Sequence, residues 1–123
     1  MAVVLIVDDE VLILQFMEMM VQDLGHETLA ASDMDEALAH LQSPQPIDAL
    51  FTDIRLKSVV LGGFDLAHEA IKLRPELRVL YTTGSSMTEK MKALFVEGAR
   101  FMQKPYTPDQ LRNSMKELLA ASF

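Results

Sequence analysis

The sequence predicts an α/β fold, a doubly wound five-stranded parallel sheet with helices on both faces. Short apolar runs of strand length alternate with longer segments in which apolar residues recur at helical spacing. The first run, residues 3–7, is aliphatic throughout, as in a strand that is buried on both faces of a parallel sheet. Because each right-handed crossover packs its helix back onto the sheet, this alternation implies helices on both sides.

The individual elements follow from residue periodicity and from glycine and proline signals. Strands are expected at 3–7, 26–31, 47–52, 77–82 and 100–103. Helices are expected at 10–24, 33–42 with Ser32 or Asp33 as N-cap, 64–73, 87–97 and 108–120. The segment 55–62 has no clean period and is expected to be a loop that Gly62 and Gly63 close.

Composition limits the possible function classes. The 123 residues, half of them hydrophobic, suit a single domain over 1–123. The absence of cysteine excludes disulfides and thiolate metal sites and favours a cytoplasmic location. A formal net charge of −7 disfavours direct binding to nucleic acid, since phosphates would be repelled. Every apolar stretch is far shorter than the roughly 20 residues of a membrane span, so no membrane insertion is expected.

Polar side chains follow four of the predicted strands. Asp8 and Asp9 follow the first, Asp53 the third, Thr83 the fourth and Lys104 the fifth. In doubly wound sheets ligands bind outside the carboxyl ends of the strands, where these residues would meet. Crowded carboxylates raise one another's pKa unless a cation lies among them. Hard oxygen ligands favour Mg²⁺, or Mn²⁺, over zinc, so the pattern indicates phosphoryl chemistry.

Four motifs in this order and spacing resemble the CheY-like receiver family of two-component signal transduction. They are VLIVDDE at 4–10, LFTDIRL at 50–56, YTTG at 81–84 and GARFMQKP at 98–105. The resemblance covers the whole chain and implies a flavodoxin-like strand order, 2-1-3-4-5.

The resemblance also implies a role for each matching residue. Asp53 would be the phosphoacceptor, a carboxylate nucleophile that forms an acyl phosphate and also contacts Mg²⁺. Asp9 would bind Mg²⁺ directly, Asp8 through water, and Arg55 through its backbone carbonyl. Lys104 would pair with Asp53 before the reaction and with a phosphoryl oxygen after it.

The same resemblance assigns a switch and partners. The Thr83 hydroxyl would bond a phosphoryl oxygen, and Phe101 would rotate inward as Thr83 moves. The partners would be a histidine kinase or histidine phosphotransfer protein and a downstream protein target that contacts the fourth helix, fifth strand and fifth helix. The chain would be a monomer or a phosphorylation-dependent dimer. It would catalyse only its own phosphorylation and dephosphorylation, with no external substrate.

The chain departs from the family pattern beside the phosphoacceptor. Lys57 stands where the family usually carries proline, and residues 57–63 form a slightly longer and more apolar loop. This loop is expected to be mobile, and Val59, Val60 and Leu61 to be a partner contact if exposed. Arg55 and Ser85 occupy positions that tune the lifetime of the phosphoryl group in the family.

Other interpretations stay open at this point. The chain could be a receiver cut from a hybrid histidine kinase or a longer regulator, or a degenerate receiver that binds partners without phosphorylation. A flavodoxin-like binder of flavin or nucleotide shares the architecture, but the sequence has neither a G-x-G-x-x-G motif nor a P-loop. An aspartyl phosphatase would need an Asp-x-Asp pattern after the first strand, where Asp8-Asp9-Glu10 stands.

Overall fold

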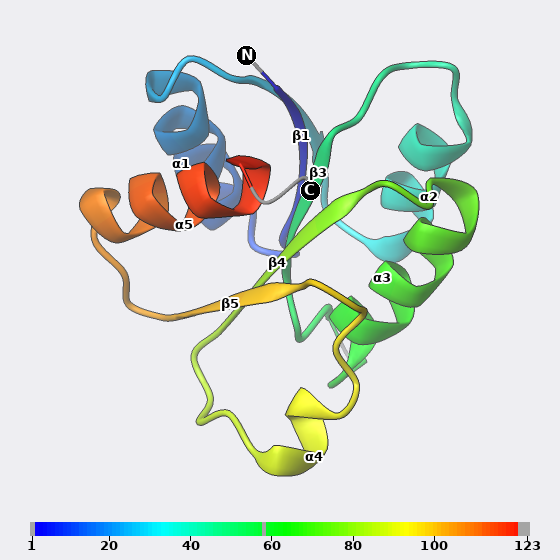
Figure 1. Ribbon diagram of the computed structural model, residues 1–123, viewed down its shortest axis with the longest axis vertical. Helices are drawn as coiled ribbons and strands as arrows, with labels where there is room; N and C mark the ends of the chain where they lie inside the picture. The colour runs from blue at the N-terminus through cyan, green and yellow to red at the C-terminus, as the bar shows by residue number, and fades with distance from the viewer. Residues whose placement is uncertain (1, 58, 121–123) are drawn as a thin grey trace.

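The computed structural model describes residues 2–57 and 59–120 (Figure 1). Five parallel strands form one sheet in the order β2-β1-β3-β4-β5, so the predicted α/β class and strand order are confirmed. The strands are β1 (Val3–Val7), β2 (Glu27–Ala31), β3 (Ala49–Asp53), β4 (Arg78–Thr83) and β5 (Arg100–Gln103). The helices are α1 (Val11–Asp23), α2 (Met34–Gln42), α3 (Gly62–Leu73), α4 (Glu89–Lys92) and α5 (Pro108–Ala120).

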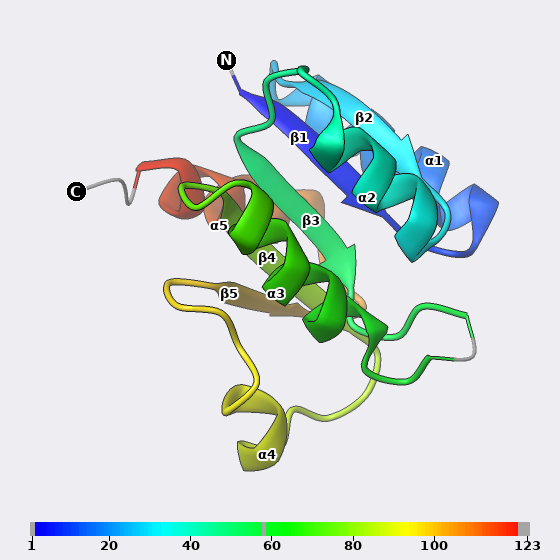
Figure 2. The same cartoon turned by 90° about the vertical axis from the view of Figure 1, so that its right-hand side faces the viewer.

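The sheet separates two apolar cores. Helices α1 and α5 cover one face, and α2 and α3 lie side by side on the other (Figures 1 and 2). Strand β1 supplies both cores because its side chains alternate: Val4 and Ile6 pack with α1 and α5, whereas Leu5 and Val7 pack with α2 and α3. All four are fully buried, as the aliphatic run predicted. None of the helices in the described parts of the chain is long and apolar enough to cross a membrane.

Side chains cap the start of two helices, and at α5 the cap is reciprocal. Asp33, one of the two predicted N-caps, accepts the Glu36 amide at 2.8 Å, and Glu36 accepts the Ser32 amide at 2.6 Å. At α5, the Thr107 hydroxyl accepts the Gln110 amide at 3.1 Å while Gln110 accepts the Thr107 amide at 2.8 Å. These contacts satisfy amide groups that a helix start otherwise leaves unpaired.

Helix α4 is much shorter than predicted. The sequence pattern favours a helix over 87–97, but only Glu89–Lys92 is helical, after an N-cap at Thr88. It lies apart from the other helices, below the sheet in Figures 1 and 2. A second, smaller difference is that Gly62 and Gly63, which were expected to close a loop, are the first residues of α3.

Tertiary contacts explain why α4 ends early. In a continuing helix the Val96 amide would bond the Lys92 carbonyl. Instead the Tyr81 hydroxyl accepts the Val96 amide at 3.3 Å, and the His68 ring nitrogen Nε2 lies 2.9 Å from the Leu94 carbonyl oxygen. Side chains from β4 and α3 therefore take the backbone groups on which the last turns of a longer helix would depend.

The Tyr81→Phe substitution tests this explanation. We expect the Val96 amide to exchange its hydrogen faster and the free energy of unfolding to fall by about 1 kcal/mol, since one buried hydrogen bond is lost. Amide hydrogen exchange by NMR and urea unfolding measure the two effects. Tyr106→Phe is the control, because no hydrogen bond in the described parts of the chain joins Tyr106 to Val96. Unchanged Val96 exchange in Tyr81→Phe would contradict the explanation.

Candidate functional site

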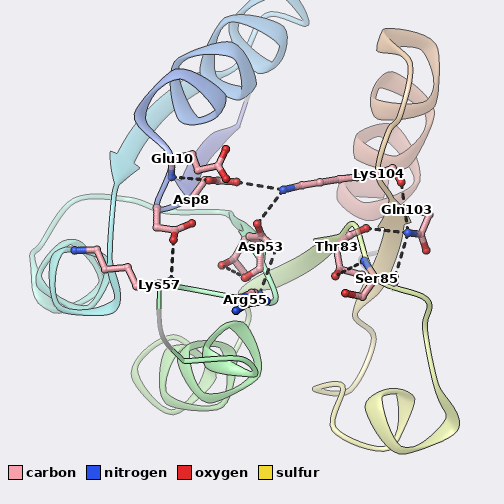
Figure 3. Close-up of polar contacts among 11 residues, drawn as sticks. Asp8, Glu10, Asp53, Arg55, Lys57, Thr83, Ser85, Gln103 and Lys104 are labelled. Carbon is pink, nitrogen blue, oxygen red and sulfur yellow. Dashed lines mark hydrogen bonds and ion pairs between the residues drawn. The ribbon is translucent and has the colours of Figure 1, made fainter.

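The carboxyl ends of four strands meet at one edge of the sheet and bring the predicted site residues together (Figure 3). Asp8 and Asp9 follow β1, Asp53 ends β3, Thr83 ends β4 and Lys104 follows β5. Carboxylate oxygens of the three aspartates lie within 4.8 Å of one another. These aspartates form the acidic triad.

Lys104 is the cation that faces the acidic triad. Its Nζ lies 2.9 Å from Asp53 Oδ2 and 3.5 Å from Asp8 Oδ2. Burial of the amine lowers its pKa, but the hydrogen bond and charge of Asp53, together with those of Asp8, raise the pKa above its usual value. Lys104 is therefore protonated at neutral pH. Its backbone amide donates to the Thr83 carbonyl at 2.9 Å, which fixes the start of this side chain beside β4.

Asp8 is the most buried member of the acidic triad, with 1% of its side chain exposed. Burial raises the pKa of Asp8, and the charges of Asp53 and Asp9 raise it as well. The Glu10 amide, which donates to Asp8 Oδ1 at 2.9 Å, and Lys104 act in the opposite direction. The single Lys104 ammonium therefore does not balance the negative charge of the three carboxylates.

The donor set of the acidic triad fits a divalent cation. All its groups are hard carboxylate oxygens, which Mg²⁺ prefers over the thiolate and imidazole ligands of zinc. The triad therefore offers the oxygen ligands that Mg²⁺ or Mn²⁺ would take.

Gly63, at the start of α3, lies very close to the backbone of Asp53 and Ile54 at the end of β3. Its amide donates to the Ile54 carbonyl at 2.7 Å, and a Cβ atom added at Gly63 would lie 2.3 Å from the Asp53 carbonyl oxygen. Only a residue without a side chain fits so close to this backbone. The sequence interpretation gave Gly63 as a residue that closes the loop after the third strand and missed this contact, because the contact depends on how the start of α3 packs on the end of β3.

Thr83 is buried at the end of β4, but its hydroxyl has a partner other than Asp53. Thr83 Oγ1 accepts the Ser85 amide at 3.1 Å. The Gln103 side-chain amide donates to the carbonyl oxygens of Thr83 and Ser85, at 3.1 Å each, and joins the ends of β4 and β5 (Figure 3). Gln103 was not predicted as a site residue; its position directly before Lys104 was the available signal.

Of two further predicted residues, Arg55 contacts the acidic triad and Phe101 lies on the neighbouring strand β5. Arg55 donates its backbone amide to Asp53 Oδ1 at 3.3 Å, and its side chain is exposed. Phe101 pairs with Tyr81 in the register of β4 and β5 and packs, half-buried, against the core beneath α2 and α3. It lies on β5 three residues before Lys104.

The loop after β3 also reaches the triad. The Lys57 amide donates to Asp9 Oδ2 at 2.9 Å, and the Lys57 ammonium lies 3.5 Å from Asp33. The sequence interpretation noted Lys57 as a departure from the family pattern but did not predict either contact. Val59, Val60 and Leu61 in the same loop are all exposed, as the expected partner contact required.

A 2-1-3-4-5 sheet with an acidic triad and a facing lysine at its carboxyl edge defines a CheY-like protein of two-component signalling. The model of the response regulator receiver domain family matches residues 4–116, and the chain belongs to this family.

Solved structures agree with this assignment. The receiver domain of NtrX from Brucella abortus is 36% identical, with a TM-score of 0.85 over 97% of this chain and 99% of that one. A receiver protein from Sinorhizobium medicae is 28% identical, with a TM-score of 0.89 over 99% and 97%.

Curated relatives are longer than this chain. The nitrogen assimilation regulatory protein NtrX of Azorhizobium caulinodans is 33% identical over 88% of this chain, and the alginate biosynthesis transcriptional regulatory protein AlgB of Pseudomonas aeruginosa is 34% identical over 89%. The chain spans 24% of the length of each. The similarity therefore concerns about a quarter of the length of each regulator.

The Gly63→Ala substitution tests the close approach at Asp53. We expect it to lower the free energy of unfolding by about 2 kcal/mol, because the added methyl group collides with backbone. Gly84→Ala is the matched control: a Cβ atom there meets nothing within 4 Å, and we expect a change below about 0.5 kcal/mol. Urea unfolding measures both variants, and equal effects would refute the packing described for Gly63.

The Asp8→Asn substitution, studied in EDTA to remove divalent cations, tests whether the acidic triad carries excess negative charge. Since the pKa of Asp8 is raised in the folded chain, the unfolded chain loses this proton first as the pH increases. Wild-type stability should therefore fall from about pH 3.8 upward through the raised pKa, and Asp8→Asn should remove this fall. We expect the variant to be more stable than wild type at pH 7.5. Urea unfolding from about pH 3.8 to 7.5 measures the free energy of unfolding of both proteins. Asp23→Asn, at an exposed carboxylate, is the control. An Asp8→Asn variant less stable than wild type at pH 7.5 would contradict the raised pKa of Asp8.

Proposed function

We propose that this chain accepts a phosphoryl group on Asp53 from a histidine kinase or a histidine phosphotransfer protein, with Mg²⁺ as its cofactor. The observation that carries the proposal is the 2.9 Å contact between Asp53 and Lys104 within the acidic triad. Asp53 ends a strand that is buried along its whole length, so its carboxylate is held at a fixed position on the edge of the sheet. Membership of the receiver family supports the same reaction.

The proposed reaction uses Asp53 as nucleophile. A carboxylate oxygen forms a bond to phosphorus while the bond from phosphorus to the donor's imidazole nitrogen breaks, and the electron pair of that bond returns to the imidazole. The Arg55 amide on Asp53 Oδ1 orients the carboxylate, and the Lys104 ammonium then pairs with a phosphoryl oxygen. The Thr83 hydroxyl, whose oxygen accepts the Ser85 amide, donates its hydrogen to another phosphoryl oxygen.

The proposed Mg²⁺ would be held by Asp9 directly, by Asp8 through water, by Asp53 and by the backbone carbonyl of Arg55. When bound, it neutralises negative charge on the transferring phosphoryl group, which is the main requirement of phosphoryl transfer. Mn²⁺ has the same ligand preference and could replace it.

We propose that the phosphorylated state is read through contact with a downstream protein. Movement of Thr83 would allow Phe101 to rotate inward and would change the surface of α4, β5 and α5, shifting a two-state equilibrium toward partner binding. Gln103 supports this coupling because its amide already joins Thr83 and Ser85 to β5. The chain would act in the cytoplasm, as a monomer or as a dimer formed on phosphorylation, with no external substrate and no direct contact with nucleic acid.

Two contexts fit this reaction. Residues 1–123 could act as a single receiver domain, which is the arrangement we propose first. The curated relatives, of which the chain spans 24%, favour a second arrangement in which the same domain regulates a longer protein.

Intact-mass spectrometry after incubation with acetyl phosphate tests the proposal. We expect wild type to gain one phosphoryl group with Mg²⁺ and none with EDTA, since the transfer depends on the cation. Asp53→Asn should gain none under either condition. Asp35→Asn, which changes an exposed carboxylate on α2, should behave as wild type.

Two results would contradict the proposal. A mass gain in Asp53→Asn equal to that of wild type would place the phosphoryl group elsewhere. No gain in wild type, from acetyl phosphate or from a phosphorylated histidine phosphotransfer protein, would favour a degenerate receiver that binds its partners without phosphorylation.

A further inference from the structure

In the loop between β3 and α3, Lys57 contacts Asp9 of the acidic triad. The Lys57 amide donates to Asp9 Oδ2 at 2.9 Å, between residues that lie 48 positions apart in the chain. In the described parts of the chain no other hydrogen bond reaches the Asp9 carboxylate. The direction of this carboxylate therefore depends on one backbone amide.

The backbone at Lys57 is unusual for a residue with a side chain. Its φ is +54°, in the left-handed region that residues other than glycine and asparagine seldom adopt, and Lys57 is the single described residue other than glycine with a positive φ. Such a conformation persists only where the surroundings hold it, and it is a reason to look for a function at that position.

The rest of the loop holds Lys57 in place. Leu56, which is 3% exposed, anchors the loop in the core beneath α2 and α3. Two backbone hydrogen bonds join Leu56 and Val59, at 3.0 and 2.9 Å, and the Gly62 amide donates to the Val59 carbonyl at 3.1 Å. Lys57 thus sits in a tight turn whose ends are pinned to β3 and α3.

The Lys57 side chain makes a second, weaker contact. Its ammonium lies 3.5 Å from Asp33 at the start of α2, but 58% of the lysine side chain and 35% of the aspartate side chain are exposed. Solvent screens an ion pair this exposed, so it contributes little. The backbone amide, not the ammonium, is the group through which Lys57 acts on the triad.

We propose that Lys57 is a positioning residue for the divalent cation: its amide holds Asp9 Oδ2 and so orients the Asp9 carboxylate within the acidic triad. This inference rests on the proposed function, in which Asp9 is a direct Mg²⁺ ligand. Carboxylates that bind metals are commonly oriented by such outer hydrogen bonds, whose loss weakens metal binding about 10- to 100-fold.

Three variants separate the amide from the ammonium. Lys57→Pro removes both the amide donor and the ammonium. Lys57→Gly removes only the ammonium, and glycine accepts the left-handed backbone without strain. Asp33→Asn removes the partner of the ammonium and keeps a side chain that caps α2. Because the Pro and Gly variants lose the same charge, a difference between them reports the backbone at Lys57, that is, the amide together with the left-handed φ of +54° that proline cannot adopt.

Isothermal titration with MgCl₂ measures the effect, and urea unfolding in EDTA checks that each variant is folded. We expect Lys57→Gly and Asp33→Asn to bind Mg²⁺ within about two-fold of wild type, and Lys57→Pro to bind it about 10- to 100-fold more weakly. Equal affinity in wild type and Lys57→Pro would overturn this inference and leave the proposed function intact. Absence of Mg²⁺ binding in wild type would overturn both.

A measurement on the wild type alone provides an independent test. By NMR, the Lys57 amide should exchange its hydrogen more slowly than the Val60 amide of the same loop, for which no hydrogen bond is found in the described residues, and the protection should persist with MgCl₂. A Lys57 amide that exchanges as fast as that of Val60 would overturn the inference, whatever the stability of the variants.

Discussion

The Lys104 ammonium lies between two carboxylates, 2.9 Å from Asp53 and 3.5 Å from Asp8, and the remainder of the carboxyl edge is arranged around this contact. Removing charges from water is costly unless they are paired. The parallel sheet makes the pairing possible, because strands β1, β3 and β5 all end at the same edge. One ammonium faces three carboxylates, and the Mg²⁺ of the proposed reaction would relieve this remaining imbalance.

Backbone amides also hold the carboxylates of the acidic triad in place. Amides of Glu10, Arg55 and Lys57 each donate to a different member of the acidic triad. Gly63 allows the start of α3 to approach the Asp53 carbonyl more closely than any side chain would permit. Backbone amides therefore orient all three carboxylates without a ligand, as the proposed phosphoryl transfer requires.

In α4 and the segment that follows it, tertiary contacts override the local preference for helix. Local sequence favours a long fourth helix, yet Tyr81 and His68 bind backbone groups of the segment that follows Lys92 and keep α4 short. Phe95 in the same segment packs against the Tyr81 ring, with ring centroids 4.8 Å apart. This segment connects the end of β4, which carries Thr83, to β5, which carries Phe101. Its conformation therefore depends on the same strands that the proposed switch would disturb.

The sequence by itself determined the α/β class, four of the five helices within a few residues, and the set of polar residues at the strand ends. It could do so because strands buried in a parallel sheet are continuous apolar runs, so the residue at which polarity returns is visible in the chain. Only the tertiary structure decided the length of α4, the need for glycine at Gly63 and the contact of Lys57 with Asp9. Each of these depends on groups that are distant in the sequence, and local periodicity carries no information about which distant group will supply a hydrogen bond or occupy a space.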